Sequence, residues 1–400
     1  MNQPLSSLKI LDFSTLLPGP FATMLLADLG ADVLRVEAPG RPDMIRAMPP
    51  FDGDTSAWHA VLNRNKRSLA LDLKQPGAVD VVKRLIAADG GGYDIVLEQF
   101  RPGVMERLGI DYAALRAVNP RLIVCAITGF GQTGPYKDHA THDNNVMALS
   151  GIMSYTGHRT CGPVALGVQV ADMGGGSFGA IMGILAAVIQ RASTGEGQLV
   201  DVSMLDMTLA WQAHLASQYL VGGEVPQREQ MPLNGGGVYD FYETKDGRFL
   251  SIGSLEPKFW QGFCAVIERP DLFGPGLQPD WAMQQQVKGD VRAVIKTRTL
   301  AEWTAVFDPL DVCVEPVLTV PEALQHPQVQ ARSMVAHVPK PDGSTQPQIA
   351  NPFKFSNAQV EYRHIGVPLG THTREVLAEI GYNDAEIASM RQTGMFGQEK

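Results

Sequence analysis

The 400-residue sequence contains few cysteines, and their spacing matches no cysteine-based site. Cys125, Cys161, Cys264 and Cys313 are scattered along the chain and form no CxxC pair. This spacing argues against a zinc site or a disulfide framework and favours a reducing compartment. The nine histidines show no HxxxH or other metal-ligand spacing, so we expect no metal.

Positive charge and long apolar runs are also scarce. The 33 Lys and Arg residues are outnumbered by 42 Asp and Glu, for a net charge of −9. That balance argues against broad nucleic-acid binding and leaves room for a local basic pocket. The most apolar run, "SFGAIMGILAAVIQ", has about 14 residues and is too short for a membrane span.

Targeting signals are not apparent at either end of the sequence. "MNQPLSSLKILDF" lacks a signal-peptide pattern, and "FGQEK" is not a peroxisomal tripeptide. We therefore expect a cytoplasmic, soluble protein with neither nucleic acid nor membrane as a partner.

Several common catalytic and nucleotide-binding motifs are missing. The first apolar run is followed by Leu17-Pro18-Gly19-Pro20 and not by GxGxxG, which disfavours a nicotinamide enzyme. There is no P-loop and no GxSxG elbow, which disfavours P-loop nucleotide binding and serine-hydrolase chemistry.

The order of the predicted elements indicates the fold class. Residues 8–15 and 33–40 are strand-like runs on either side of a helical pattern over residues 18–32, which is a βαβ unit. Strand-like runs over 68–73, 93–100 and 121–130, with a helical pattern over 78–88, repeat this alternation. The pattern predicts an α/β, doubly wound domain with a parallel sheet.

A shift in composition predicts a second, smaller domain. Residues 219–237 are rich in Gly, Pro and polar residues, and residues 238–254 form a predicted hairpin around Lys245-Asp246-Gly247. Gly235–Gly237 is either a plain linker or a mobile flap. We predict a large domain over residues 1–222 and a small α+β domain over 223–325. Residues 326–400, with a capping box at Asn383 and Glu386, return to the large domain.

Asp172 and His142 are the candidate reactive residues. Asp172 precedes Gly174–Gly176 and a long apolar helix. It is either a helix N-cap or part of a site where a ligand approaches the glycine backbone. We expect the helix to be buried because it is apolar nearly all round. His142, in "THDNNV", is an exposed loop residue, a structural histidine or a base.

Basic residues gather in two segments. Residues 63–68 ("NRNKRS") precede a predicted strand, and residues 99–109 ("QFRPGVMERLG") follow one. Each is either a solvated surface run or part of a phosphate-binding site at the strand ends.

Together these segments resemble the family III CoA transferases, which include α-methylacyl-CoA racemases. The resemblance runs through "LDFSTLLPGPFATMLLADLGADVLRVEAPG", "NRNKRSLALDLK", "FRPGVMERLG", "ITGFGQTGP", "GILAAVIQRASTGEGQLVDVSMLD", "YETKDGRFL" and "GVPLGTHTREVL". It implies a large Rossmann-like domain built from both termini, a small domain between them, and an interlocked homodimer. It also implies an acyl-CoA thioester substrate and no cofactor beyond the CoA moiety.

Two reactions share this scaffold. In the transferases, the aspartate that matches Asp172 is a nucleophile that forms a mixed anhydride and then an aspartyl-CoA thioester. In the racemases, that aspartate and a histidine matching His142 exchange protons with the α-carbon. An acid in this role needs a pKa raised by burial. "THDNNV", "ADMGGGS" and "GSLEPKFW" all look more like racemase segments, so we expect epimerisation of a 2-methylacyl-CoA.

The resemblance assigns the remaining site residues. Glu256 would support the catalytic pair of His142 and Asp172. The CoA contacts would come from Leu17, Leu71, Asp72, Lys74, Gln99, Phe100, Arg101, Arg107 and Asp143. Ala38 and Val146 depart from the racemase pattern, where an arginine and a tyrosine are usual.

Overall fold

A computed structural model describes residues 3–87 and 92–397, which divide into two compact units. The first unit comprises Met1–Met147, Gly167–Ala210 and Gln330–Lys400, and the second comprises Ala148–Leu166 and Trp211–Val329. The second unit is larger than the small domain predicted over residues 223–325. It also takes in the segment Ala148–Leu166 and the residues from Trp211 onward.

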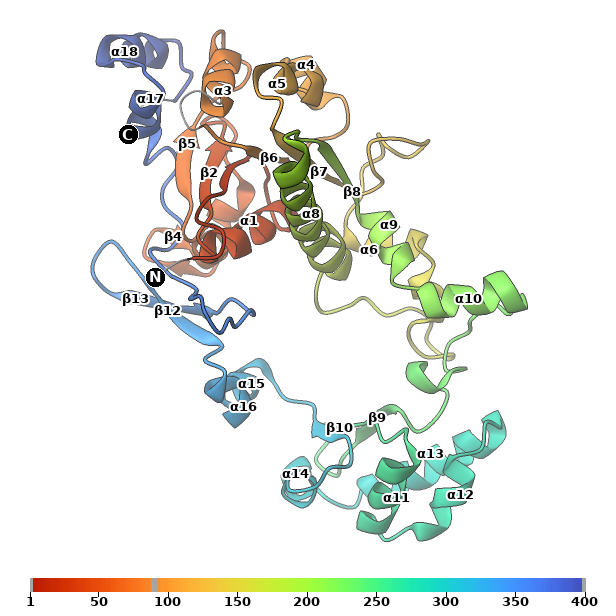
Figure 1. The fold of residues 1–400 in the computed structure, drawn as a ribbon. Helices are drawn as coiled ribbons and strands as arrows, with labels where there is room; N and C mark the ends of the chain where they lie inside the picture. Colours follow the sequence, from red (N-terminus) through yellow and green to blue (C-terminus); the bar gives the residue numbers. More distant parts are fainter. Residues whose placement is uncertain (1–2, 88–91, 398–400) are drawn as a thin grey trace. The chain divides into compact units, whose positions relative to one another are not determined.

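A parallel sheet of six strands forms the centre of the first unit, in the order β5-β2-β1-β6-β7-β8 (Figure 1). The predicted α/β class and the parallel sheet are thereby confirmed. The order reverses between β1 and β6, and open α/β sheets bind ligands beyond the carboxyl ends of the strands at such a point. The strands are β1 (Lys9–Asp12), β2 (Asp32–Glu37), β5 (Arg67–Ala70), β6 (Ile95–Glu98), β7 (Ile123–Thr128) and β8 (Leu199–Ser203).

Helices cover the sheet on both faces because the strands are apolar on both sides. On one face, Ile10, Val33 and Ile95 share a core with α1 and α8, and on the other Leu11 and Leu34 pack with α3, α5 and α17. The helices of this unit include α1 (Pro18–Asp28), α2 (Ala57–Leu62), α3 (Ala78–Ile86), α4 (Val104–Leu108), α5 (Tyr112–Val118), α6 (Asp143–Leu149), α8 (Gly179–Thr194), α9 (Met204–Ala210), α17 (Thr373–Glu379) and α18 (Asp384–Gln392). Helix α18 begins with the predicted capping box of Asn383 and Glu386.

A buried ion pair ties the C-terminal segment to the first unit. The Arg64 guanidinium donates to both carboxylate oxygens of Asp28, at 3.0 and 2.7 Å, and neither side chain is exposed. Arg64 also donates to the carbonyl of Ile349 and stacks on the ring of Tyr362. The segment carries a short hairpin of β12 (Val335–Pro339) and β13 (Thr345–Ile349). The predicted return of the chain to the large domain thus rests on Asp28 and Arg64.

The second unit has its own small sheet and an aromatic core. Its antiparallel strands, in the order β11-β10-β9, include the predicted hairpin around Gly247. The rings of Trp260, Phe263 and Phe307 stack in this core with centroids 5.3 and 5.7 Å apart. The strands are β9 (Asp240–Glu243), β10 (Phe249–Ile252) and β11 (Val314–Pro316), and the helices include α7 (Ile152–Tyr155), α10 (Ala213–Gly222), α11 (Pro257–Val266), α12 (Phe273–Gly276), α13 (Trp281–Ile295), α14 (Leu300–Phe307) and α15 (Val320–Gln325).

The segment Gly235–Gly237 is anchored within this unit. The buried Lys288 ammonium donates to the carbonyl of Gly235 at 2.5 Å and pairs with Asp240 at 2.7 Å. Of the two alternatives that the sequence leaves open, these contacts favour a fixed connection over a mobile flap.

Helix α8 corrects one expectation. The sequence predicts a helix that is buried because it is apolar nearly all round, but Met182 is 62% exposed and Ile189 is 73% exposed. Only the face that carries Ala180, Ile184 and Ala187 packs against the sheet, since a helix beside a single sheet buries one stripe. The helical stretch Ala171–Thr194 is long and apolar enough to cross a membrane, a test that core helices of soluble proteins also pass.

Glu98 is a buried acid at the carboxyl end of β6, beside the reversal of strand order. Its Oε2 accepts the N–H of Phe100 at 2.7 Å and so shapes the turn that follows β6. Burial and, to a lesser extent, the charge of Asp201 raise the pKa of Glu98 to about 7, against the opposing effect of that hydrogen bond. Glu98 and Asp201 flank Ala126 in one row across β6, β7 and β8.

Removing the Arg64 side chain should strongly destabilise the protein. Arg64→Ala leaves the buried Asp28 carboxylate without its partner, so we expect the free energy of unfolding to fall by about 3–5 kcal/mol. Arg116→Ala is the control, because it breaks an exposed ion pair with Glu196 and should cost less than about 1 kcal/mol. Urea unfolding measures both values, and equal losses would contradict the role given to Arg64.

Replacing Glu98 should change how stability depends on pH. A pKa raised from 4.5 to about 7 means that the stability contributed by protonated Glu98 is complete below pH 4.5 and is lost as the pH rises to about 7. Glu98→Gln cannot ionise and so does not lose this stability. The free energy of unfolding of the variant minus that of the wild type should therefore increase by about 3 kcal/mol from pH 4 to pH 8. Glu196→Gln, at an exposed site, should parallel the wild type. A constant difference between Glu98→Gln and wild type across this range would refute the assignment.

Candidate active site

The loop between β1 and α1 is held in place at the carboxyl ends of the central strands. Leu16 has a φ of 62°, a conformation that leucine rarely adopts, and its N–H donates to Asp43 Oδ2 at 2.9 Å. The Gly19 N–H donates to Gln99 Oε1 at 3.0 Å, which joins the start of α1 to the turn after β6. A Cβ atom at Gly19 would lie 2.2 Å from the Cβ of Ser14, so only glycine fits there.

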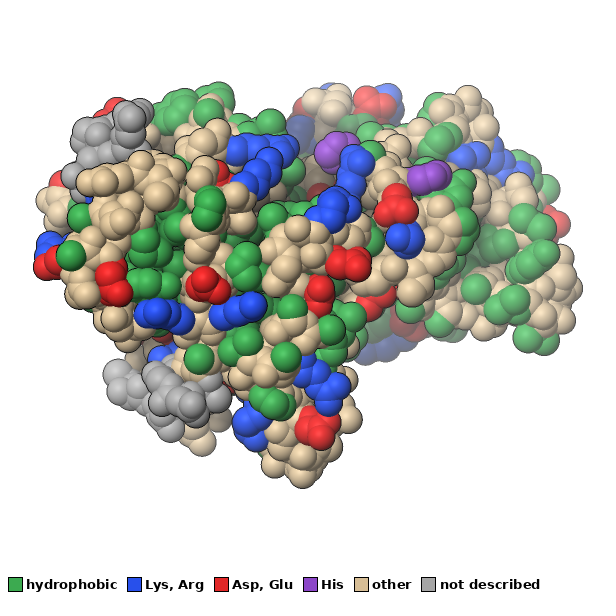
Figure 2. Space-filling view, turned by 90° about the horizontal axis from the view of Figure 1, so that it is seen from above, with side chains coloured by type: hydrophobic (Ala, Val, Ile, Leu, Met, Phe, Trp, Pro, Cys, Tyr) green, Lys and Arg blue, Asp and Glu red, His purple; other side chains and the backbone are tan. Residues whose placement is uncertain are grey.

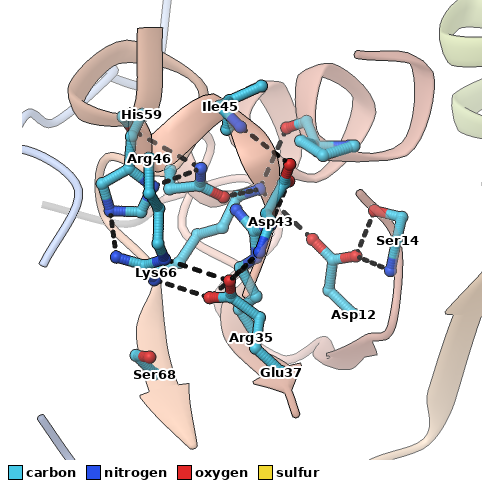
Figure 3. A network of polar contacts seen from close by, with 12 residues as sticks. Asp12, Ser14, Arg35, Glu37, Asp43, Ile45, Arg46, His59, Lys66 and Ser68 are labelled. Carbon is cyan, nitrogen blue, oxygen red and sulfur yellow. Dashed lines mark hydrogen bonds and ion pairs between the residues drawn. The ribbon is translucent and has the colours of Figure 1, made fainter. Parts of the chain in front are cut away.

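Buried charges behind this loop form the network drawn in Figure 3. Arg35 donates to Asp43 at 2.5 Å and lies 3.3 Å from Glu37, and Arg46 joins Glu37 to the imidazole of His59. Burial alone would raise the pKa of Glu37, but the hydrogen bond from Arg46 and the charge of Arg35 lower it to about 2. Burial and the charge of Arg46 lower the pKa of His59 to about 3, so this imidazole is neutral.

The segment 63–68 belongs to the core, which corrects its predicted alternatives. The Lys66 ammonium is buried and donates to Asp12 at 3.2 Å, to the Pro20 carbonyl and to Asn63. Burial lowers the pKa of Lys66 to about 8, against the charge of Asp12. Arg64 is buried on Asp28, and Arg67 pairs with Asp32, Glu375 and Glu379. Arg64 and Lys66 are therefore buried and paired, and the partly exposed Arg67 is engaged by three carboxylates, so none of these cations is free to bind phosphate.

Asp172 lies in the first turn of a π-helix, Ala171–Phe178. The N-cap of this helix is Val170, so the prediction that Asp172 is an N-cap is wrong. π-Helical turns inside longer helices are frequent at functional sites. The glycines that follow serve packing, because a Cβ at Gly176 would lie 2.9 Å from Pro18 and one at Gly175 would lie 3.3 Å from the Met204 carbonyl. The sequence left open that a ligand approaches the backbone here, but at Gly175 and Gly176 the neighbours that come this close are α9 and α1.

His142 and Asp143 lie beside Asp172 in the same unit. The His142 carbonyl accepts the N–H groups of Asn145 and Val146, so the residue immediately precedes α6. Its imidazole is exposed, and among residues 3–87 and 92–397 it has no hydrogen-bond partner. Asp143 is half-buried, and its Oδ1 accepts the Asp172 N–H at 3.0 Å.

The protonation of Asp172 is unusual for a carboxyl group. Burial and, after it, the charge of Asp143 raise its pKa to about 6, against the opposing charge of His142. The direction is the one required of an acid that donates a proton near neutral pH. The imidazole of His142 and a carboxyl group with a raised pKa therefore lie within electrostatic reach of each other.

The residues predicted to contact CoA are distributed around the strand ends. Lys74, Arg101 and Arg107 are exposed, and Phe100 is half-buried against the core. Leu17 is the residue before α1, and Gln99 is bound to Gly19 as described above. The Leu71 side chain is 1% exposed within the core, so only its main chain is available to a ligand.

A cavity of about 1100 Å³ lies beyond the ends of β2 and β5. Asp72 is the one predicted CoA residue in its lining, where it receives the N–H of Lys74. Arg46 and His59 also line it, and both are engaged in the buried network. Asp172 and His142 are not among its lining residues.

Glu256 lies in the second unit, at the residue before α11, and its side chain is exposed. Its assignment to the catalytic site stays a prediction. The described residues hold no group of three or more His, Cys, Asp or Glu placed to bind a metal ion.

Two residues that shape the site, Asp43 and Glu98, were missed in the sequence, and Asp143 was predicted only as a CoA contact. Asp43 holds Leu16, Glu98 holds Phe100, and the Asp143 side chain holds Asp172. Each is a carboxylate that accepts a main-chain N–H. A strand that ends in an acid, as in "VLEQF", is the only local signal of Glu98, while the partners of Asp43 and Asp143 lie 27 and 29 residues away.

Comparison with known proteins gives consistent results along the whole chain. The model of CoA-transferase family III matches residues 5–373. Human alpha-methylacyl-CoA racemase is 35% identical over 387 residues, covering 96% of this chain and 95% of the relative. Succinate–glutarate CoA-transferase of Agrobacterium fabrum is also 35% identical, over 390 residues, covering 94% and 96%. Racemases and transferases are therefore similar to this chain to the same degree.

A solved structure agrees in fold. The CAIB/BAIF family protein from Brucella suis has a TM-score of 0.82 and 30% identity, over 95% of this chain and 100% of that one. With the Rossmann-like strand order and the family match over residues 5–373, this likeness confirms the resemblance seen in the sequence. The chain is an enzyme that belongs to CoA-transferase family III.

Proposed function

We propose that this enzyme epimerises the α-carbon of 2-methylacyl-CoA thioesters by proton transfer between His142 and Asp172. The observation that carries the proposal is an exposed imidazole, without a hydrogen-bond partner in the part of the chain that the structure describes, beside a carboxyl group whose pKa is raised to about 6. A two-base reaction needs one group ready to accept a proton and another ready to donate one at the same pH.

In one turnover the α-carbon loses one proton to the enzyme and receives another from it. His142 removes the α-proton, and the electron pair of the C–H bond moves into the thioester to form an enolate. The protonated Asp172 then delivers its proton to the opposite face of the α-carbon. The enzyme is left with an imidazolium and a carboxylate, which is the state that converts the opposite epimer.

The substrate would be held by its CoA portion. We assign the phosphate groups to the exposed Lys74, Arg101 and Arg107, which flank the turns after β5 and β6. Charge-assisted contacts of this kind position an acyl group for reaction without entering the chemistry. Leu17, the main chain of Leu71, Asp72, Gln99 and Phe100 would complete the CoA contacts, and Glu256 would support the catalytic pair.

CoA transfer is the second candidate, favoured by the transferase relatives at the same identity. Ionised Asp172 would attack the thioester carbonyl, releasing CoA thiolate and forming a mixed anhydride. The thiolate would then attack the Asp172 carbonyl, forming an aspartyl-CoA thioester and freeing the first acid. A second carboxylate would reverse these steps. A carboxyl group with a pKa of about 6 is mostly ionised above neutral pH, as a nucleophile must be, so the pKa of Asp172 is compatible with this candidate as well.

We also propose that the enzyme acts as an interlocked homodimer in the cytoplasm. Apolar side chains are exposed on α8 and on α10. On α10, Leu220 is 77% and Val221 is 89% exposed. Figure 2 shows further apolar side chains exposed among interspersed acidic and basic ones on one face. Exposed apolar surface of this extent marks an interface. The four cysteines are free, as a reducing compartment requires.

Isotope exchange tests the epimerase proposal. With a 2-methylacyl-CoA in D2O and no acceptor acid, we expect deuterium at C2, detected by mass spectrometry. His142→Gln and Asp172→Asn should each slow the exchange by roughly 10²–10⁴-fold, because each removes one of the two proton carriers. His139→Gln, at an exposed histidine close by in the sequence, is the matched control and should retain it.

The opposite pattern would establish CoA transfer. In that case CoA would move to a free carboxylic acid, C2 would gain no deuterium, and His142→Gln would keep much of the activity. Hydroxylamine or borohydride would then trap an intermediate on Asp172.

Light scattering after gel filtration tests the dimer. We expect a mass twice the chain's 43.3 kDa, independent of dilution into the nanomolar range. A mass of one chain would exclude the interlocked dimer, since threaded chains do not separate without unfolding.

A further inference from the structure

The Asp143 carboxylate is a link between α6 and the π-helix that carries Asp172. Its Oδ1 accepts the Asp172 N–H at 3.0 Å, across 29 residues of sequence. The first amides of a helix have no partner within the helix, and here the Asp143 side chain satisfies one of them. Asp143 follows His142 directly, so a single backbone step positions the base and fixes the main chain of the acid.

The same carboxylate acts on the protonation of Asp172. After burial, the charge of Asp143 is the second cause that raises the Asp172 pKa, and His142 opposes it. The elements packed against the π-helix are α1, α8, α9 and β8. Of their acids, Asp201 on β8 and Asp206 on α9 are exposed, and Asp28 on α1 is neutralised by Arg64. Asp143 is therefore the acid that acts on Asp172.

We propose that Asp143 is a positioning residue for the proton transfer: its side chain fixes the main chain of Asp172 and places a negative charge beside the Asp172 carboxyl group. The inference rests on the proposed epimerase function. It differs from the CoA contact that the family resemblance assigns to Asp143, because the side chain acts on another protein residue.

The chemical need for such a residue follows from the proton affinities. A free carboxyl group of aspartate and a free imidazole differ by about 2.6 pK units, roughly a 400-fold preference for the proton on the imidazole. An epimerase has to use both arrangements of the proton, so that preference would leave the arrangement with a protonated carboxyl rarely occupied. A fixed negative charge beside Asp172 raises its proton affinity and reduces the imbalance.

Asp143→Asn separates charge from geometry. The amide oxygen of asparagine still accepts the Asp172 N–H, but the negative charge is lost. We expect the acid limb of the pH profile of kcat/KM for deuterium exchange to move down by about one pH unit. The value of kcat should fall several-fold with little change in KM, because in this proposal the Asp143 side chain acts on Asp172 and not on the substrate.

Three further variants complete the series. Asp143→Ala loses both charge and acceptor, so it should show the same shift with a larger fall in kcat. Asp143→Glu keeps a negative charge, so its acid limb should lie between those of Asp143→Asn and the wild type. Asp206→Asn is the control, because this exposed carboxylate lies on α9, which packs against the same π-helix, and its profile should match the wild type.

A direct titration keeps this inference separate from the proposed function. The protein labelled with ¹³C at the aspartate carboxyls gives the Asp172 signal by NMR, assigned by its loss in Asp172→Asn. Without substrate, the Asp172 pKa should be lower in Asp143→Asn than in the wild type. An unchanged pKa, or a change in KM alone, would overturn the role of Asp143. Absence of deuterium exchange in the wild type would overturn the epimerase proposal instead.

Discussion

The ion pair between Asp28 and Arg64 is the contact on which the first unit depends. It is bidentate and fully buried, and Asn65 and Asn351 add hydrogen bonds to the same carboxylate. Through it the end of α1, the chain before β5 and the C-terminal return are held together. A buried carboxylate without such partners would be strongly destabilising, so these segments are stable only when assembled. Strand β5 and helix α17 then complete the edge of the sheet.

Side-chain carboxyl groups that accept main-chain N–H groups fix the backbone at the candidate site. Asp43 holds Leu16 in a left-handed conformation, Glu98 shapes the turn at Phe100, and Asp143 fixes Asp172. A charged acceptor such as an ionised aspartate makes a stronger hydrogen bond than a neutral one, which suits the segments at Leu16 and Asp172. The position of Asp172 thus depends on a residue that carries no proton in the proposed reaction.

Local patterns predicted much of the fold. The strand and helix alternation, the hairpin at Gly247 and the capping box at Asn383 all depend on neighbouring residues, and the structure confirms them. The errors came where distant contacts override local pattern. The sequence places Lys66 and Arg64 in a surface or phosphate-binding segment, but they are buried and paired with Asp12 and Asp28. It predicts a buried α8, but only one face of that helix is packed.

The sequence by itself determined the fold class, the family and the identity of the candidate acid and base, because periodicity and motifs are properties of consecutive residues. Only the tertiary structure decided how Asp172 is protonated and what holds it in place. Burial and the charge of Asp143 set the pKa of that carboxyl group, and both arise from segments far apart in the chain. Proton affinity depends on the dielectric and charges around a group, which no local stretch of sequence specifies.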